Sequence, residues 1–146
     1  MDKRLQHILD VHEIREVSIR YNRAADVSDG AAFAALFTAD GEFDIVGNRT
    51  YRGRTEIASV CSGSHNIMHI AVDSQVEVNG DTATQISKLI VGKISDDRAS
   101  MQFIGTTTMT DLFVREDGRW LIRRRQSHLD TDPAVALSRL AVKAQD

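Results

Sequence analysis

Two histidines four positions apart are the residues of this chain with the clearest capacity for chemistry. His65 and His69 interrupt a largely apolar stretch, SHNIMHIAVD, at residues 64–73. If the stretch is a strand, its side chains alternate between two faces, so His65, Ile67 and His69 point the same way. Such a pair can bind a metal ion, can contain one catalytic base, or can consist of two hydrogen-bonded imidazoles in a protein interior.

A metal site needs more ligands than these two residues supply. Zinc in proteins is normally held by three or four side chains, and a zinc-binding histidine pair on a helix has a glutamate beside its first member. No cluster of cysteine and histidine accompanies the pair, and Cys61 is the only cysteine of the chain. We therefore expect no metal and no other cofactor. A neutral imidazole is instead a competent general base near pH 7.

The first part of the chain must position these residues through helices. Residues 10–26 place Ile14, Val17 and Tyr21 at helical spacing with charged residues between them, which predicts an amphipathic helix. Ser28 is a possible N-cap for a short second helix through residues 36 and 37. The segments that follow read as a turn at 39–41, a strand at 42–46, and a short strand, glycine break and third helix at 51–60.

The second part of the chain reads as four long strands. They cover residues 72–78, 82–94, 99–114 and 119–129, separated by NGD, SDDR and EDGR, each of which suits a hairpin turn. Helices followed by an antiparallel meander predict an α+β fold in which three helices cover one face of a strongly curved sheet. The cone that results has an apolar pocket at its open end.

The length of 146 residues suffices for one core, so we expect a single domain over residues 1–146. The packed core is expected at about 10–130. Pro133 marks its end, and the tail at 133–146 is expected to form a short helix or an arm exchanged with a partner chain.

Charge and hydropathy exclude several classes of protein. The chain has 18 Lys and Arg against 21 Asp and Glu, without a basic block, so we expect no binding to nucleic acid. A single cysteine, the lack of a signal peptide and the lack of a long apolar run predict a soluble cytoplasmic protein without a membrane partner. Thr, Ile and Val residues between Gln102 and Val114 would leave a partly apolar outer sheet face, which predicts self-association.

Five segments, in their order along the chain, resemble the SnoaL-like (polyketide-cyclase-like) branch of the nuclear-transport-factor-2-like superfamily. They are RYNRAADVSDGAAFAALFTADGEFDI, YRGRTEI, SHNIMHIAVD, NGDTAT and VREDGRWLIRRR, and the resemblance covers about residues 10–130. It implies a cystatin-like cone and a homodimer or homotrimer. The superfamily includes dehydratases, a dehydrochlorinase, isomerases, an epoxide hydrolase, aldol cyclases and non-catalytic binding modules, so the fold alone does not specify the reaction.

The site pattern resembles most closely those of scytalone dehydratase, bile-acid dehydratase and hexachlorocyclohexane dehydrochlorinase. This resemblance implies a dyad in which Asp26, near the end of the first helix, orients His69 as the base. It also implies that Tyr21 donates a hydrogen bond to a leaving hydroxyl or an enolate oxygen and that Arg125 stabilises a departing anion. The residues alone leave open that Asp26 only terminates a helix, that Tyr21 is a core residue, and that Arg125 is exposed on the sheet.

The other predicted site residues shape the pocket. His65 is expected near the entrance, where it would contact substrate, whereas His69 lies further inward and removes the proton. The substrate is expected to be small and hydrophobic, of the steroid, polyketide, terpenoid or aromatic type. The residues expected to line its apolar site are Phe43, Ile45, Ile67 and Phe103.

These features predict a cofactor-independent lyase of the dehydratase or dehydrohalogenase type. A polyketide cyclase or a ketosteroid-type isomerase is the enzymatic alternative, because RYNRAAD also resembles the isomerase helix with Tyr21 at its oxyanion position. The isomerase base would be Asp44, which strand alternation places on the face opposite Ile45. The third alternative is a non-catalytic small-molecule-binding or assembly module, with a collapsed pocket or with His69 too far from Asp26 to bond.

Overall fold

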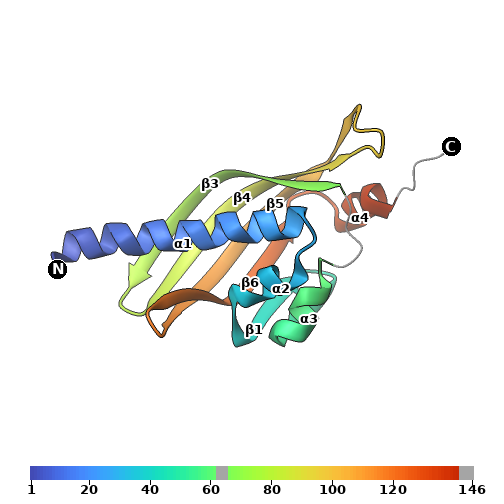
Figure 1. The fold of residues 1–146 in the computed structure, drawn as a ribbon. Helices are drawn as coiled ribbons and strands as arrows, with labels where there is room; N and C mark the ends of the chain where they lie inside the picture. The colour runs from blue at the N-terminus through green and yellow to red at the C-terminus, as the bar shows by residue number, and fades with distance from the viewer. Residues whose placement is uncertain (62–65, 142–146) are drawn as a thin grey trace.

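Residues 1–61 and 66–141 are described by the structure, a computed structural model. Their elements follow the order α1, α2, β1, β2, α3, β3, β4, β5, β6, α4. The predicted α+β class is confirmed. Figure 1 shows α1 lying along one face of a curved, open sheet, with α2 and α3 beside β1 at one end.

The first helix begins earlier than the predicted start at residue 10. α1 spans Lys3–Asp26, and Asp2 caps it by accepting a 2.7 Å hydrogen bond from the backbone N–H of Arg4. None of its buried residues precedes Asp10. Burial on the sheet therefore begins at Asp10, and the apolar residues of the preceding turns, Leu5, Ile8 and Leu9, are exposed.

The second helix is capped by a different residue from the one predicted. α2 spans Gly30–Ala35, and the Asp29 carboxylate accepts a 3.0 Å hydrogen bond from the N–H of Ala32. Ser28 does not serve as the cap, because it has a φ of 57° and lies in the tight connection between the helices. The third helix, α3, spans Gly53–Ser59.

The sheet has the strand order β2-β1-β6-β5-β4-β3. Strands β3 to β6 form the predicted antiparallel meander, while β1 pairs parallel with β6 and antiparallel with β2. The turn predicted at 39–41 lies inside β1, where the pairing with β6 shifts between Phe37 and Glu42. The bounds are β1 Phe37–Ile45, β2 Arg49–Arg52, β3 Ile67–Asn79, β4 Thr82–Ile94, β5 Met101–Glu116 and β6 Arg119–Leu129.

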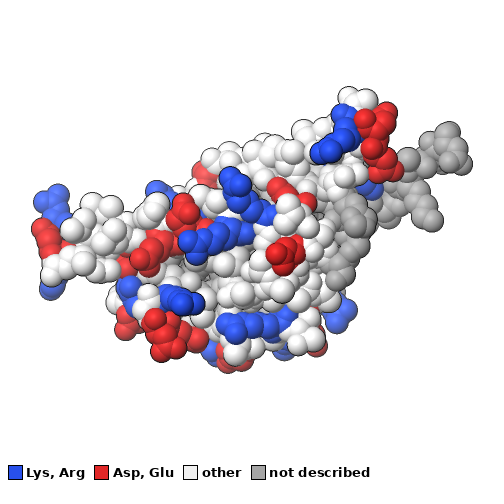
Figure 2. Space-filling view, in the orientation of Figure 1, with Lys and Arg blue, Asp and Glu red and all other residues white. Residues whose placement is uncertain are grey.

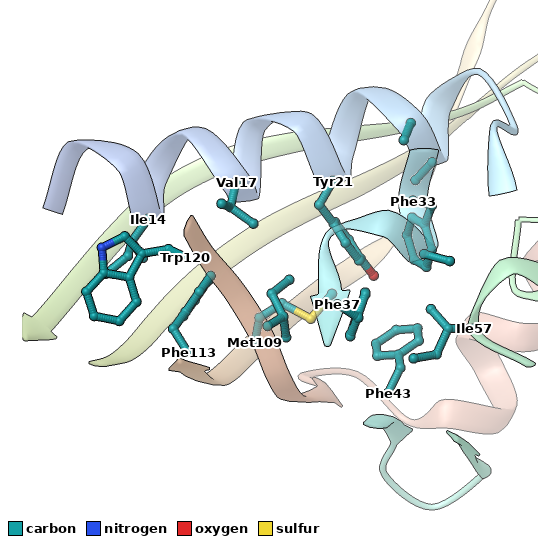
Figure 3. Packing of buried hydrophobic residues seen from close by; sticks show 14 of the residues in the cluster. Ile14, Val17, Tyr21, Phe33, Phe37, Phe43, Ile57, Met109, Phe113 and Trp120 are labelled. Carbon is teal, nitrogen blue, oxygen red and sulfur yellow. The ribbon is translucent and has the colours of Figure 1, made fainter. Parts of the chain in front are cut away.

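The core lies between α1 and the sheet and changes character along the helix. At the N-terminal end, Ile14 and Val17 lie near Trp120 and Phe113, as Figure 3 shows. Further along, Tyr21 packs against Phe33, with ring centroids 4.4 Å apart. The rings of Phe33, Phe37 and Phe43 lie 6.0 to 6.3 Å from one another. Aromatic side chains therefore surround the end of the core where the sheet opens.

The tail after the last strand forms a helix, α4, at Pro133–Ala141, which is one of the two forms predicted for it. It lies at the end of the sheet away from the N-terminus (Figure 1). The guanidinium of Arg139 donates a 3.0 Å hydrogen bond to the Ile104 carbonyl of β5. Ala136 is buried against the sheet. The tail therefore covers one end of the sheet.

The surface carries charges of both signs. On the face drawn in Figure 2, Lys and Arg side chains are interspersed with Asp and Glu, without a broad patch of either sign. Among residues 1–61 and 66–141, no helix combines the length and the apolar character needed to cross a bilayer.

Candidate active site

A cavity of about 320 Å³ occupies the open end of the fold. α1, α2 and β1 form one side of it, and the inward faces of β3, β4, β5 and β6 form the other. Most of its wall is apolar. Its lining residues are Tyr21, Ala25, Phe33, Phe43, Ile45, Asn48, Tyr51, Val60, Cys61, Ile67, His69, Val91, Ile104, Gly105, Thr107, Met109, Ser127, Leu129 and Ala136.

His69 and Asp26 lie together at this cavity. The Nδ1 atom of His69 is 2.7 Å from Oδ1 of Asp26, and the same oxygen accepts a 2.9 Å hydrogen bond from the backbone N–H of His69. A carboxylate can only accept, so Nδ1 carries the proton of this bond. Nε2 is then the ring nitrogen with a free lone pair in the neutral imidazole. Within the part of the chain that the structure describes, Nε2 makes no hydrogen bond.

Asp26 and His69 come together because the end of α1 lies beside the start of β3. Asp26 is the last residue of α1, and His69 is the third residue of β3. The side chain of His69 is 18% exposed and that of Asp26 is 29% exposed, so both are partly shielded from water. The shared oxygen holds both the ring and the backbone of His69, which fixes the imidazole at the wall of the cavity.

Tyr21 also lines the cavity, while Arg125 lies beside it in the protein interior. The Arg125 guanidinium lies over the Tyr21 ring, 4.0 Å from the centroid of that ring. Arg125 is 1% exposed. Its Nε and Nη2 atoms donate hydrogen bonds of 2.7 and 2.6 Å to the two carboxylate oxygens of Asp111, so the two side chains form a bidentate ion pair. Arg125 is therefore not exposed on the sheet, and it lines a smaller cavity of about 180 Å³ between α1 and strands β3 and β4.

Burial sets the protonation of Tyr21 and its neighbour. Burial raises the pKa of Tyr21 well above its ordinary value, and the nearby Arg125 charge offsets this only in part. Burial would lower the pKa of Arg125, but the Asp111 carboxylate outweighs it and the pKa is raised. At ordinary pH the site therefore holds a neutral phenol beside a charged guanidinium.

The three successive arginines of IRRRQ differ in exposure because β6 contains a bulge. The pairing with β5 shifts between Ile122 and Arg124, so Arg123 is an extra residue on that strand. Arg123 and Arg124 are exposed, and Arg123 pairs with Asp40 at 2.9 Å. Strand alternation alone would give Arg123 and Arg125 the same face, and the bulge separates them.

Three of the four apolar residues predicted to line the site do so, and one does not. Phe43, Ile45 and Ile67 line the cavity. Phe103 does not, because the register of β5 against β4 shifts at Ile104, which turns Ile104 inward and leaves Phe103 51% exposed. The prediction for Phe103 is therefore wrong. His65 lies outside the described residues.

The alternative base, Asp44, is engaged elsewhere. Its carboxylate accepts hydrogen bonds from Thr50 at 3.0 Å and from Gln126 at 3.3 Å, and it does not line the cavity. Its neighbour Ile45 does. Strand alternation therefore holds here as predicted.

Cys61 and Asp111 were given no role from sequence. Cys61 lines the cavity, and burial raises the pKa of its thiol to about 11, so it is protonated and unreactive near neutral pH. Asp111 is buried and lies directly opposite Arg125 in the strand pairing. The sequence could have indicated a role for Asp111, because a carboxylate at an inward position of a strand requires a cation or hydrogen-bond donors.

Within the described ranges, no three His, Cys, Asp or Glu side chains form a group that could hold a metal ion.

Comparisons with known proteins agree with this fold. The family model of the SnoaL-like domain matches residues 6–126. Among curated proteins, none matches the chain. A protein from Novosphingobium aromaticivorans described as nuclear-transport-factor-2-like with a cystatin-like fold is 29% identical, with 96% of this chain and 94% of that chain covered and a TM-score of 0.81.

Two further solved structures extend the comparison. A protein of unknown function from Mycobacterium tuberculosis is 25% identical, with 99% of this chain and 83% of that chain covered and a TM-score of 0.82. A hexachlorocyclohexane dehydrochlorinase is 16% identical, with 88% of this chain and 90% of that chain covered and a TM-score of 0.77. At this identity the dehydrochlorinase shares the fold, and the chemistry of the chain must be argued from its own site.

Proposed function

The chain belongs to the SnoaL-like domain family of the nuclear-transport-factor-2-like superfamily, and we propose that it is a cofactor-independent lyase acting on a small hydrophobic substrate. The observation that carries the proposal is the 2.7 Å hydrogen bond between Asp26 and Nδ1 of His69 at the wall of an apolar cavity of about 320 Å³. A non-catalytic binding or assembly module would not need an imidazole that is oriented by a carboxylate.

In the proposed reaction, Nε2 of His69 removes a proton from a carbon next to an activating group. The electron pair of the C–H bond forms the new double bond, and the leaving group departs with the electrons of its own bond. If hydroxide leaves, the imidazolium returns the proton so that water is released and His69 becomes neutral again. Asp26 stabilises the imidazolium during this cycle and holds the ring in the tautomer that can accept the proton.

Proton abstraction can be measured before the natural substrate is known. 2-Tetralone is a hydrophobic bicyclic ketone with acidic C–H bonds, and a base that removes one of these protons in D2O incorporates deuterium, which NMR detects. We expect the protein to accelerate this exchange. His69→Ala and Asp26→Asn should each slow the catalysed exchange by about 10² to 10⁴, the range for loss of a general base or of its orienting carboxylate.

Two matched variants control the experiment. His128→Ala replaces an exposed histidine on β6, and Asp44→Asn replaces the carboxylate of the isomerase alternative. Both should exchange like the unmodified protein. Losses below tenfold in both His69→Ala and Asp26→Asn would refute the dyad, and a large loss in Asp44→Asn would favour the isomerase mechanism.

A further inference from the structure

Two buried hydroxyl groups interrupt the apolar wall of the larger cavity. Thr107 of β5 and Ser127 of β6, the hydroxyl pair, both line this cavity and are 2% and 6% exposed. Their side-chain oxygen atoms lie 2.9 Å apart. In the strand pairing, Ser127 lies between Ile45 of β1 and Met109 of β5, and both of these apolar residues also line the cavity. The hydroxyl pair is therefore a polar spot in apolar surroundings.

The hydrogen-bond directions within the hydroxyl pair follow from the number of protons. The Thr107 hydroxyl has one proton, and its oxygen lies 3.0 Å from the carbonyl oxygen of His128. A carbonyl can only accept, so Thr107 donates this proton to His128. The 2.9 Å contact is then a hydrogen bond only if Ser127 donates and Thr107 accepts. This arrangement is the one that satisfies both contacts.

The same arrangement makes Ser127 an acceptor toward the cavity. Its single proton is directed to Thr107, while its oxygen retains lone pairs that can accept. Within residues 1–61 and 66–141, the Ser127 hydroxyl has no hydrogen-bond partner besides Thr107. A buried oxygen in apolar surroundings is stabilised when a donor bonds to it. The cavity wall thus presents a fixed acceptor that a donor group of a ligand can fill.

The hydroxyl pair and the proposed base lie on different parts of the cavity wall. His69 is on β3, an edge strand of the sheet, and strands β4 and β5 lie between β3 and β6 (Figure 1). A substrate that contacts both His69 and Ser127 must therefore extend across the cavity. Its reacting carbon and its hydrogen-bond donor then belong to different ends of the molecule.

We propose that Ser127 determines specificity by accepting a hydrogen bond from a hydroxyl or N–H group of the substrate, and that Thr107 is a positioning residue that holds Ser127 in this role. The inference rests on the proposed lyase function. It narrows the substrate to a hydrophobic skeleton with a neutral donor at the end away from the reacting carbon. Proton abstraction remains the task of His69, and Ser127 takes no part in it.

Binding of two ligands of nearly the same shape tests this inference without turnover. Indole has an N–H donor where benzofuran has an acceptor oxygen. Isothermal titration calorimetry measures the dissociation constants of both. We expect the protein to bind indole about tenfold more tightly than benzofuran, as one hydrogen bond in an apolar cavity allows. Ser127→Ala should abolish this preference and leave benzofuran binding within about twofold.

Ser87→Ala is the matched control for this substitution. Ser87 is also 6% exposed, and it pairs with Met109 from the side opposite Ser127. It lines the smaller cavity of about 180 Å³ and not the larger one. The same substitution at Ser87 should therefore keep the full preference for indole. Loss of the preference in both variants would show a general effect on the fold and would overturn the role of Ser127.

Two substitutions at Thr107 test its positioning role. Thr107→Val has nearly the same shape but removes the acceptor of the Ser127 proton, so the Ser127 hydroxyl becomes free to rotate and to donate to a ligand. Benzofuran should then bind more tightly, and the preference for indole should fall severalfold. Thr107→Ser retains the acceptor and should retain the preference. A merely structural role would weaken both ligands equally in Thr107→Val, and that outcome would overturn the positioning role.

His69→Ala separates this inference from the proposed function. Nε2 of neutral His69 is also an acceptor at the cavity wall, so it competes with Ser127 for the indole N–H. We expect His69→Ala to keep the preference for indole, so failure of the dyad in the exchange experiment leaves this test intact. A preference that is lost in His69→Ala and kept in Ser127→Ala would overturn the proposal. Equal binding of the two ligands by the unmodified protein would overturn it as well.

Discussion

The ring of His69 has two nitrogens with separate tasks, and the proposed mechanism depends on their separation. Nδ1 is held by Asp26 at 2.7 Å, so only Nε2 can receive a proton from a ligand. The backbone N–H of the same residue also bonds to Asp26, at 2.9 Å. A side-chain substitution at position 69 therefore removes the base and keeps the backbone contact between β3 and the end of α1.

The two histidines of SHNIMHIAVD should differ in kinetic effect. His69→Ala should abolish turnover of any substrate that is found, with nearly unchanged binding, because the base acts selectively in the transition state. His65→Ala should mainly weaken substrate binding and keep turnover within about tenfold. This prediction for His65 rests on the sequence alone, since the residue lies outside the described part of the chain. Steady-state kinetics of both variants check it, and equal losses of turnover would contradict it.

Cys61 should make the stability of the protein fall at alkaline pH. Burial raises the pKa of its thiol from 9.0 to about 11. Between these two values the unfolded chain loses the proton while the folded protein retains it, so the free energy of unfolding decreases as pH rises. Urea denaturation from pH 8 to pH 11 measures this decrease. Cys61→Ala should flatten it, and an unchanged slope in that variant would show that another group is responsible.

At the scale of elements, the N-terminal half of α1 is attached to the sheet through one buried carboxylate. Asp10 accepts hydrogen bonds from Trp120 Nε1 at 3.3 Å and from Gln6 at 3.0 Å, and it pairs with Arg115 at 2.9 Å. The Arg115 guanidinium also stacks on the Trp120 ring, 4.4 Å from its centroid. Asp10 thus connects α1 to the hairpin of β5 and β6.

Removal of this carboxylate should destabilise the fold. Asp10→Ala leaves the buried Trp120 N–H without its acceptor, and we expect the free energy of unfolding to fall by about 1 to 3 kcal/mol. Asp81 is the matched control, because it pairs with the same Arg115 but has an 82% exposed side chain. Asp81→Ala should change the free energy of unfolding by less than about 1 kcal/mol. Equal effects in urea denaturation would contradict this assignment.

The same carboxylate gives the fold an acid sensitivity. Burial would raise the pKa of Asp10, but hydrogen bonds from Gln6, Trp120 and Arg115 outweigh it and hold the pKa below 3.8. Its contribution is therefore present above about pH 4 and is lost as pH falls through the folded value. Asp10→Asn should reduce the acid-dependent loss of stability, measured by urea denaturation between pH 5 and pH 2. If Asp10→Asn loses stability in acid as steeply as the unmodified protein, the acid sensitivity arises from other carboxylates.

Periodicity predicts the elements well wherever burial follows a regular pattern. The predicted strands at 82–94 and 119–129 have the bounds of β4 and β6. The errors lie at irregular places, namely the cap at Ser28, the shifted pairing inside β1 and the bulge beside Phe103. A bulge adds one residue and reverses the faces beyond it, and no local composition specifies where this happens.

The pairing of Asp26 with His69 could be predicted from the sequence only because the family resemblance implies both members of the pair. Asp26 and His69 are 43 positions apart, and helical and strand spacing alone would not have joined them. The environment of Arg125 was not predictable in the same way, because the charge that engages it comes from Asp111, on a different strand. Register between long strands decides such contacts, and the hydrophobic pattern leaves register at polar positions weakly specified.

At the scale of the whole molecule, we propose that residues 1–146 form one domain. α1 packs on the edge strand β3 and bonds through Asp10 to Trp120 at the start of β6. A chain whose first helix is attached to its last strand should unfold as one unit. Thermal unfolding should give a single transition by circular dichroism and by tryptophan fluorescence, which reports Trp120. Separate transitions for the two signals would contradict a single domain.

The outer face of the sheet leads to the last prediction, that the chain self-associates. Ile70, Ile86, Phe103 and Leu112 are each at least 39% exposed, and all four lie on the adjacent strands β3, β4 and β5. Apolar surface of this kind on a folded chain is stabilised by association with a second copy. We expect a homodimer or homotrimer in sedimentation velocity at micromolar concentration.

Charged substitutions on this face should dissociate the assembly because a lysine ammonium buried in an apolar interface has no partner. Ile86→Lys/Leu112→Lys should sediment as a monomer with unchanged circular dichroism. Val27→Lys adds the same charge at an exposed apolar position after α1, away from the sheet face, and should keep the assembly. A monomeric unmodified protein would contradict self-association, and dissociation by Val27→Lys as well would place the interface elsewhere.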